Sequence, residues 1–118
     1  MVFWFKRLGA FALLSFAAAE VAAASGDASS FHKEIKPLLE KYCWDCHGDG
    51  MDKGKVSFDT FKSDQEMLEK KDLWLHALKN VRAGIMPPAK KPRPSKAEIE
   101  KLGHWVKHDV FAIDPRNP

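Results

Sequence analysis

Apolar side chains recur at helical spacing in four separate stretches of the chain. The first stretch runs from Phe31 to Tyr42, where the apolar positions follow an i, i+3, i+4, i+7 pattern. Ser30 is the expected N-cap, and Pro37 requires either a kink or a later helix start, because proline removes a helical hydrogen bond. The pattern therefore predicts an amphipathic helix that ends beside Cys43. Its apolar positions are Ile35, Leu38, Leu39 and Tyr42.

The second and third stretches predict a short helix followed by a longer one. Ser63 and Glu66 have the spacing of a capping box for the short helix. Asp72 is expected to cap the longer helix over residues 73–81, which Gly84 ends. The expected buried residues are Met67 and Leu68 in the short helix and Leu73, Trp74, Ala77, Leu78 and Val81 in the longer one.

The fourth stretch predicts a terminal helix with a clear start, because Ser95 and Glu98 have capping-box spacing. Gly103 is unfavourable inside this helix and typically marks a point where another helix backbone comes close. His104 and His108 are expected on the solvated side, opposite a buried face made of Ile99, Leu102, Trp105 and Val106. Four helical stretches without a strand-helix-strand pattern predict an all-α fold.

Residues 1–24 have the features of a secretory leader. Lys6 and Arg7 provide a positive start, an apolar stretch follows, and the segment ends in small residues of the kind that a signal peptidase recognises. Cleavage is expected before Ser25, which would leave a flexible start over residues 25–30 and no stable membrane span. An uncleaved leader would instead tether the protein to a membrane, although the apolar run is short for a spanning helix. The protein is therefore expected outside the cytoplasm, in the periplasm.

The five residues Cys43-Trp44-Asp45-Cys46-His47 carry the chemistry that these helices would support. Two thiols three positions apart lie on one side of a helical turn, from which they can reach the two vinyl groups of one porphyrin. His47 follows directly and can offer a ring nitrogen to the iron from the same side. The spacing therefore predicts one covalent haem c, with Cys43 and Cys46 as thioether sites and His47 as the proximal iron ligand.

Three other uses of these cysteines compete with the haem interpretation. A thioredoxin-like dithiol would require a strand-helix-strand pattern around the cysteines, which the sequence lacks. A zinc site would need His104 and His108 to join the two thiolates, but they lie far beyond the ~12–15 residues that a zinc finger uses. A disulfide between cysteines this close would be strained and would leave His47 unexplained.

Composition agrees with a small exported domain that holds a large cofactor. The chain has 118 residues, which allows one domain whose small core would gain from an apolar cofactor. Both cysteines belong to the haem motif, so no disulfide framework is left to assign. The formal net charge is +3, and the lysines are interspersed with carboxylates, so no nucleic-acid partner is predicted.

The segment Ile85-Met86-Pro87-Pro88 supplies the expected second iron ligand. Prolines fix their own φ angles and push the preceding residue into an extended conformation, so Met86 projects from a stiff segment. A thioether suits haem iron, and Met/His ligation raises the reduction potential. Met51 lies too near His47 to reach the opposite haem face easily, and Met67 lies on a predicted helix without a stiff flank. Met86 is therefore the predicted distal ligand, and an open sixth position is the alternative.

Further residues are expected around the haem. The apolar side of the helix over residues 73–81 should pack on it, and a haem propionate is one candidate partner for the Trp74 indole N–H. Val56 and Phe58 are expected at the haem edge. A basic rim follows the methionine segment, and it would steer an acidic redox partner unless it is only a solvated loop. This rim consists of Lys90, Lys91, Arg93 and Lys96.

Residues 31 to about 114 resemble the planctomycete-type cytochrome c domain, a haem module of class I cytochrome c character that often heads a longer polypeptide. The resemblance implies four short helices wrapped around one haem, with the first and last helices crossing. By this resemblance Cys43, Cys46 and His47 carry over as thioether sites and proximal ligand, and Met86 as the distal ligand. The chain lacks the proline that commonly follows the motif and orients the proximal histidine, so the group that orients His47 is open. The matching positions are Pro37-Leu38-Leu39, Tyr42-Cys43, Cys46-His47-Gly48, Lys53-Gly54, Phe58-Asp59, Leu73-Trp74, Arg82-Ala83-Gly84, Met86-Pro87-Pro88, Arg93-Pro94-Ser95 and Trp105.

We therefore expect a cytochrome c domain over residues 31–113, followed by a tail or linker start at residues 114–118. The predicted function is haem binding and outer-sphere transfer of single electrons outside the cytoplasm, without substrate chemistry. A peroxidase-like haem enzyme or a ligand sensor with an open sixth iron position is the main rival. A zinc-binding structural module is the third interpretation.

Overall fold

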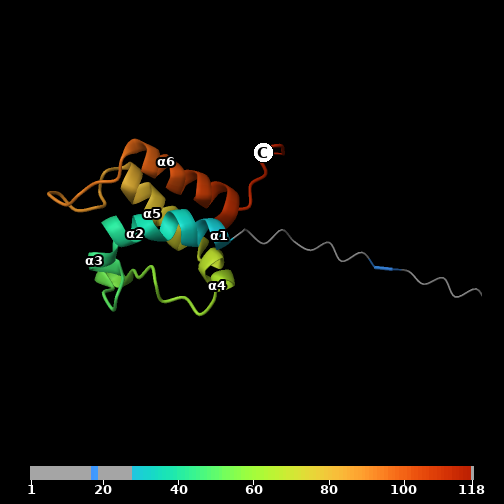
Figure 1. Ribbon diagram of the computed structural model, residues 1–118, viewed down its shortest axis with the longest axis horizontal. Helices are drawn as coiled ribbons and strands as arrows, with labels where there is room; N and C mark the ends of the chain where they lie inside the picture. The colour runs from blue at the N-terminus through green and yellow to red at the C-terminus, as the bar shows by residue number, and fades with distance from the viewer. Residues whose placement is uncertain (1–16, 19–27, 118) are drawn as a thin grey trace, which may run out of the picture.

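Helices make up the fold of the residues that the computed structural model describes, 17–18 and 28–117, and no strand occurs among them (Figure 1). This confirms the predicted all-α class. Most of the predicted leader, including the expected cleavage site before Ser25, lies outside the described residues. None of the described helices is long and apolar enough to cross a membrane.

The first amphipathic stretch forms one continuous helical segment. It consists of α1 (Ala28–Ser30), the π-helical η1 (Phe31–Ile35) and α2 (Lys36–Tyr42). The helix begins at Ala28, so residues 28–30 are helical and not part of a flexible start as predicted. Ser30 lies within the helix without a capping hydrogen bond. The Lys36 N–H bonds to the Phe31 carbonyl across a wide π turn, and Pro37 follows in the first turn of α2. The wider turn accommodates the proline, which an ordinary α-helical turn would exclude.

Two short elements and a loop connect the first helix to α4. They are α3 (Trp44–His47) and the single 3₁₀ turn η2 (Lys53–Lys55). In α4 (Asp64–Glu69) the Ser63 hydroxyl accepts the Glu66 N–H, which confirms the predicted cap. The Glu66 carboxylate accepts the N–H of Lys62 and not that of Ser63, so the second half of the predicted capping box is shifted by one residue.

The remaining helices form an α5–α6 pair joined by a long loop. α5 (Lys71–Arg82) begins before Asp72, so this carboxylate lies in the first turn and does not cap the helix as predicted. Gly84 ends α5 at φ +73°, a conformation that favours glycine. α6 (Lys96–Trp105) starts with the predicted capping box of Ser95 and Glu98, and η3 (Val106–Val110) continues it.

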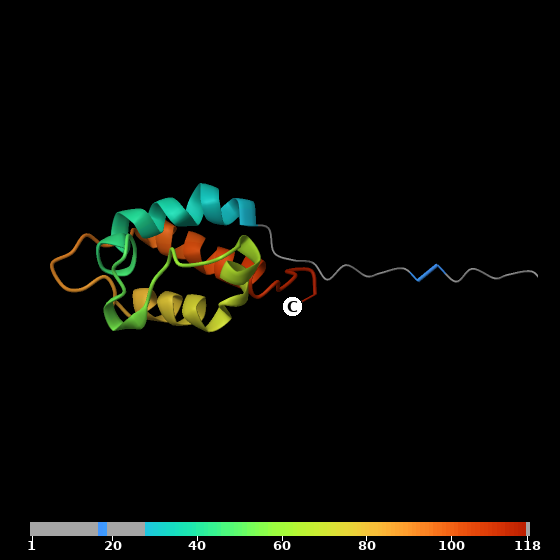
Figure 2. The same cartoon turned by 90° about the horizontal axis from the view of Figure 1, so that it is seen from below.

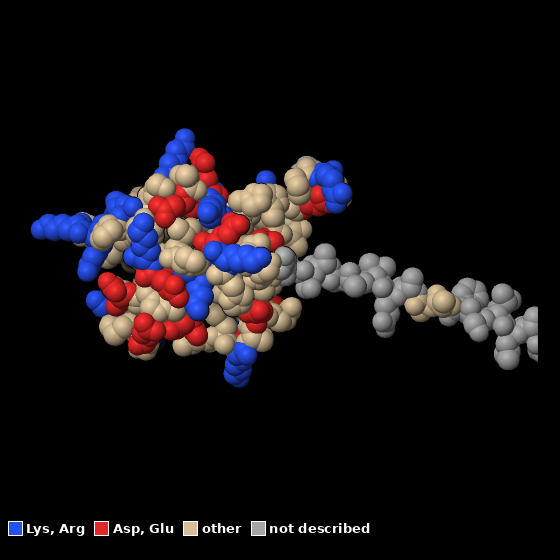
Figure 3. All heavy atoms as spheres, in the orientation of Figure 1, with Lys and Arg blue, Asp and Glu red and all other residues tan. Residues whose placement is uncertain are grey.

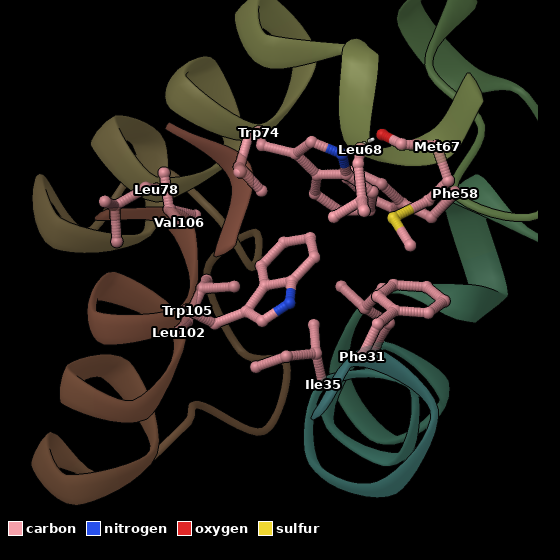
Figure 4. Close-up of a cluster of buried hydrophobic side chains, with 12 residues drawn as sticks. Phe31, Ile35, Phe58, Met67, Leu68, Trp74, Leu78, Leu102, Trp105 and Val106 are labelled. Carbon is pink, nitrogen blue, oxygen red and sulfur yellow. Dashed lines mark hydrogen bonds between the residues drawn. The ribbon is translucent and has the colours of Figure 1, made fainter. Parts of the chain in front are cut away.

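Two tryptophans stand at the centre of the hydrophobic core (Figure 4). Trp74 of α5 has no exposed surface, and Trp105 of α6 is 2% exposed. Their rings meet edge to face with centroids 4.9 Å apart, and Phe31 of the first helix packs 5.5 Å from Trp105. Aromatic pairs of this kind stabilise the fold beyond the burial of their apolar area. The first helix, α5 and α6 therefore pack together mainly at this cluster.

Gly103 has a different neighbour from the one that the sequence analysis expected. It is buried in α6, and a side chain there would collide with the guanidinium of Arg82 and approach Leu78. Both residues belong to α5, so the close approach is to side chains of α5 and not to another helix backbone. The first and last helices do pack together, and the Tyr42 hydroxyl donates to Glu98 at 2.9 Å between them.

The loop between α5 and α6 lies at the same end of the molecule as α3, and both views agree on this (Figures 1 and 2). The N-terminus of the first helix and α4 lie at the other end, where His32 and Asp64 are 2.8 Å apart. The fold therefore brings the segment around Met86 to the end that carries the cysteine motif.

Candidate haem site

Both cysteines of the motif are half-buried thiols on one helical turn. Cys43 follows α2 with a φ of −122°, and the His47 N–H bonds back to the Cys43 carbonyl at 3.0 Å, which closes the turn. Neither cysteine forms a disulfide. Burial, and secondarily the charge of the neighbouring Cys46, raises the pKa of the Cys43 thiol to about 11, so it is protonated at neutral pH.

The imidazole of His47 is oriented by a backbone carbonyl. Its Nδ1 lies 2.9 Å from the Val56 oxygen, and because that oxygen can only accept, Nδ1 carries the proton. Nε2 is then the nitrogen available to bind a metal, because the other nitrogen is held by the carbonyl. This arrangement answers the question that the missing proline left open, since Val56 supplies the orienting carbonyl.

The loop that carries Val56 is closed by hydrogen bonds on either side of the histidine. The Phe58 N–H donates to the His47 carbonyl at 2.8 Å. The Asp59 carboxylate accepts the Ser57 hydroxyl at 2.6 Å and the Asp49 N–H at 2.7 Å. The Ser57 hydroxyl, and secondarily the Asp49 N–H, lower the pKa of Asp59. The Asp59 carboxylate is therefore ionised at neutral pH, and its hydrogen bonds connect the two parts of the loop. The sequence analysis assigned Asp59 no role, although Ser-x-Asp spacing is typical of such local bonds.

Phe58 connects the histidine to the core. It is 6% exposed, its ring stacks on Trp74 at 5.5 Å, and it meets the His47 ring edge to face at the same centroid distance. Phe58 is predicted at the haem edge, and in the structure its ring lies between His47 and Trp74 of the core. A rigid aromatic contact on one side of His47 restricts rotation of the imidazole.

Trp74 does not have the free donor that a propionate contact would need. Its indole N–H donates to the Met67 carbonyl at 2.7 Å inside the core. The sequence analysis named a haem propionate as a candidate partner for this N–H. That interpretation is corrected, because a buried tryptophan satisfies its donor with the nearest carbonyl, here at the end of α4.

The three methionines considered as distal ligands lie in different surroundings. Met67 is 1% exposed and packed in the core, whereas Met51 is 44% exposed on the loop after the motif. Met86 is half-buried, and its N–H donates to the Asn80 carbonyl at 3.1 Å. Only Met86 therefore combines a partly accessible side chain with a backbone held by the end of α5.

The donor set and its surroundings fit a covalent haem. Two thiols and an imidazole with its Nδ1–H held are the groups that attach this cofactor and bind its iron. Cys43 and Trp44 of the motif and Val56 of the following loop are partly buried and pack against the hydrophobic core, so the motif has an apolar side that would suit a flat apolar ligand. A surface pocket of about 490 Å³ also lies beside Phe61 and Leu73, but its lining does not include the motif. The motif and not this pocket therefore defines the site.

The alternative zinc arrangement is not assembled in the described residues. They contain no group of three or more His, Cys, Asp or Glu side chains that could hold a metal ion. His104 and His108 have ring centroids 4.3 Å apart, and His108 Nδ1 bonds to the Ile113 carbonyl at 2.7 Å. α6 runs from the end of the molecule that carries α3 toward the other end (Figure 1), and His104 lies in its last turn with His108 beyond it in η3.

An all-α fold that presents a Cys-x-x-Cys-His turn with an oriented histidine is the arrangement expected of a haem-binding cytochrome c module. Residues 43–90 match the family model described as Planctomycete cytochrome C. This match confirms the resemblance predicted from the sequence, and its bounds include the haem motif and Met86. Comparisons with curated proteins and with solved structures gave no match.

Proposed function

We propose that the protein is a monohaem electron carrier. The observation that carries this proposal is the hydrogen bond from His47 Nδ1 to the Val56 carbonyl, because it prepares Nε2 to bind iron. Haem, when bound, supplies the one-electron couple of its iron. The chain's own residues hold it: Cys43 and Cys46 by thioethers, His47 as the proximal ligand and Met86 as the distal ligand.

A carrier needs ligands that move little between oxidation states, and the surroundings of both proposed ligands support this. His47 is held at its ring nitrogen by Val56 and at its carbonyl by Phe58. Met86 lies in a segment stiffened by prolines and bonded to Asn80. The chain's own hydrogen bonds restrain both segments, so reorganisation of the protein on electron transfer would be small.

The distal ligand decides between a carrier and a haem enzyme or sensor. We expect the oxidised wild type to show the weak sulfur-to-iron charge-transfer band at the red edge of the visible spectrum. Met86→Ala should abolish the band, lower the potential and open the iron to cyanide or carbon monoxide. Met51→Leu, which changes an exposed methionine, should leave the band in place. Rapid carbon monoxide binding by a wild type without the band would favour the enzyme or sensor.

Covalent attachment is tested separately from ligation. Cys46→Ala should remove one thioether and shift the pyridine haemochrome band of protein matured with its haem. A wild type that carries no haem after expression in a host competent for cytochrome maturation would refute the whole proposal, including haem binding.

We also propose export of the chain and docking of an acidic redox partner at the basic rim. Figure 3 shows basic side chains projecting at the end that carries the loop between α5 and α6. Lys90 and Lys91 are exposed there, and the apolar Ile85 is 62% exposed on the same loop. A rim of this kind would raise the association rate at low salt. A mature protein from the periplasm should begin at Ser25, whereas an intact N-terminus in the membrane fraction would indicate a tether.

Charge reversal tests the docking surface. The double change Lys90→Glu, Lys91→Glu should slow electron transfer with the native partner by roughly tenfold or more at low salt, and much less at high salt. The double change Lys33→Glu, Lys107→Glu alters the net charge by the same amount at exposed positions on η1 and η3, and it should have little effect. Equal rates for the rim variant and wild type at low salt would show that the rim is only a solvated loop.

A further inference from the structure

One guanidinium binds three carbonyls of the segment that contains Met86. Arg93 donates from one terminal nitrogen to the Pro87 carbonyl at 2.9 Å. Its other terminal nitrogen donates to the Gly84 carbonyl at 2.8 Å and approaches the Met86 carbonyl at 3.4 Å. The sequence analysis placed Arg93 in the basic rim, but its donors are directed at the loop's own backbone.

The contacts suit arginine and no other side chain. The planar guanidinium has five donors in a fixed fork, so it can satisfy several carbonyls that converge on it. The ammonium of a lysine is a point charge at the end of a flexible stem and would not span the same set. Arg93 therefore acts as a cross-brace between the start of the loop at Gly84 and the start of α6.

Both ends of this brace are anchored. Ser95, two residues after Arg93, is fixed by the capping box at the start of α6. On the other side, the N–H groups of Ile85 and Met86 both donate to the Asn80 carbonyl, at 2.9 and 3.1 Å. Met86 is thus held through its N–H by α5 and through its carbonyl by Arg93, while its thioether is left for other contacts.

We propose that Arg93 is the positioning residue for Met86, and that its bonds to the Gly84, Met86 and Pro87 carbonyls limit how often the thioether leaves the iron. The inference rests on the proposed function, because it takes Met86 as the distal ligand. It assigns Arg93 to ligand retention and leaves the lysines of the loop as the docking charges.

The rate at which cyanide binds the oxidised haem protein tests this role, because an external ligand enters only when Met86 has left. Arg93→Gln should raise this rate on the order of tenfold, equivalent to about 1.4 kcal/mol of lost retention. Arg93→Lys keeps the charge but cannot span the carbonyls, so it should raise the rate to a similar extent. Lys91→Gln removes a charge from the same loop and should leave the rate within about twofold of wild type.

Two results of the cyanide measurement would overturn the proposal. If Arg93→Lys behaves as wild type, or if Lys91→Gln behaves as Arg93→Gln, charge and not the cross-brace controls ligand loss. Far-UV circular dichroism identifies any variant that is globally unfolded. Amide hydrogen exchange then provides a readout that does not depend on iron ligation, because Ile85 and Met86 should lose protection in Arg93→Gln. Unchanged protection refutes the brace, whereas a wild type without the sulfur-to-iron band refutes the proposed function.

Discussion

The two core tryptophans allow a controlled test of buried hydrogen bonding. Both side chains are at most 2% exposed, and they contact each other edge to face. The Trp74 N–H is bonded to the Met67 carbonyl, whereas the Trp105 N–H is buried without a partner among the described residues. Replacing either tryptophan by phenylalanine removes a similar apolar volume. Trp74→Phe also removes a satisfied hydrogen bond, whereas Trp105→Phe removes an unsatisfied donor, so the difference in stability between the two variants reports the hydrogen bonding.

The magnitude follows from the contacts. Loss of indole volume should lower the free energy of unfolding by about 1–2 kcal/mol in either variant. Trp74→Phe also loses a hydrogen bond that contributes about 1 kcal/mol to stability. The cost is not larger because the Met67 carbonyl still accepts the Lys70 N–H at 3.3 Å and is not left without a donor. Trp105→Phe removes an unsatisfied donor, which returns about 1–2 kcal/mol. We therefore expect Trp74→Phe to be less stable than Trp105→Phe by roughly 2 kcal/mol.

Urea unfolding of the haem-loaded protein, followed by far-UV circular dichroism, measures both variants under one reference state. For a domain of this size, a difference of 2 kcal/mol corresponds to roughly 8–16 °C in Tm. Equal losses in the two variants would refute the reasoning. In that case the Trp105 N–H has a partner in the haem-loaded protein, or the Trp74 bond contributes nothing net.

Two further predictions concern packing beside the motif and the start of α6. Gly48→Ala should lower stability by about 1–3 kcal/mol and broaden the haem spectrum, because a side chain at Gly48 would collide with the Trp44 ring. Gly50→Ala meets no atom, so any cost there comes from its φ of +87° and not from a collision. The Ser95 N–H, and secondarily the Tyr42 hydroxyl, lower the pKa of Glu98 from its ordinary value of 4.5. The ionised Glu98 therefore stabilises the fold above pH 4.5, and this stabilisation is lost as the pH falls through the lowered pKa. A Glu98→Gln variant should flatten this acid limb in thermal melts recorded between pH 6 and pH 3.

Helix positions could be predicted wherever side chains alone specify them. The Ser95–Glu98 box and the Ser63 cap were correct, because a capping hydroxyl and its spacing are visible in the sequence. Asp72 was wrong as a cap, since the helix start depends on how the preceding α4 ends at Lys70. Boundaries set by a neighbouring helix have no local signature.

The supports of the proposed iron ligands were harder to predict for a related reason. The group that orients His47 is the backbone carbonyl of Val56, and every residue has such a carbonyl. Arg93 looked like a surface charge, because its sequence neighbours are basic and only the fold turns the loop carbonyls toward it. The haem motif was visible because its chemistry lies in side chains at fixed spacing.

Ligand positioning and core stability are supported by different parts of this fold. His47 and Met86 are restrained by hydrogen bonds between local backbone groups and by single side chains at one end of the molecule. The core that determines global unfolding lies between η1, α5 and α6, with Phe58 as its contact to His47. A core variant such as Val106→Ala, which removes apolar volume at a side chain that is 2% exposed, should therefore lower the melting temperature while leaving the potential and the cyanide rate unchanged. Variants of Arg93 should do the reverse, since the loop can open without disturbing the packed tryptophans.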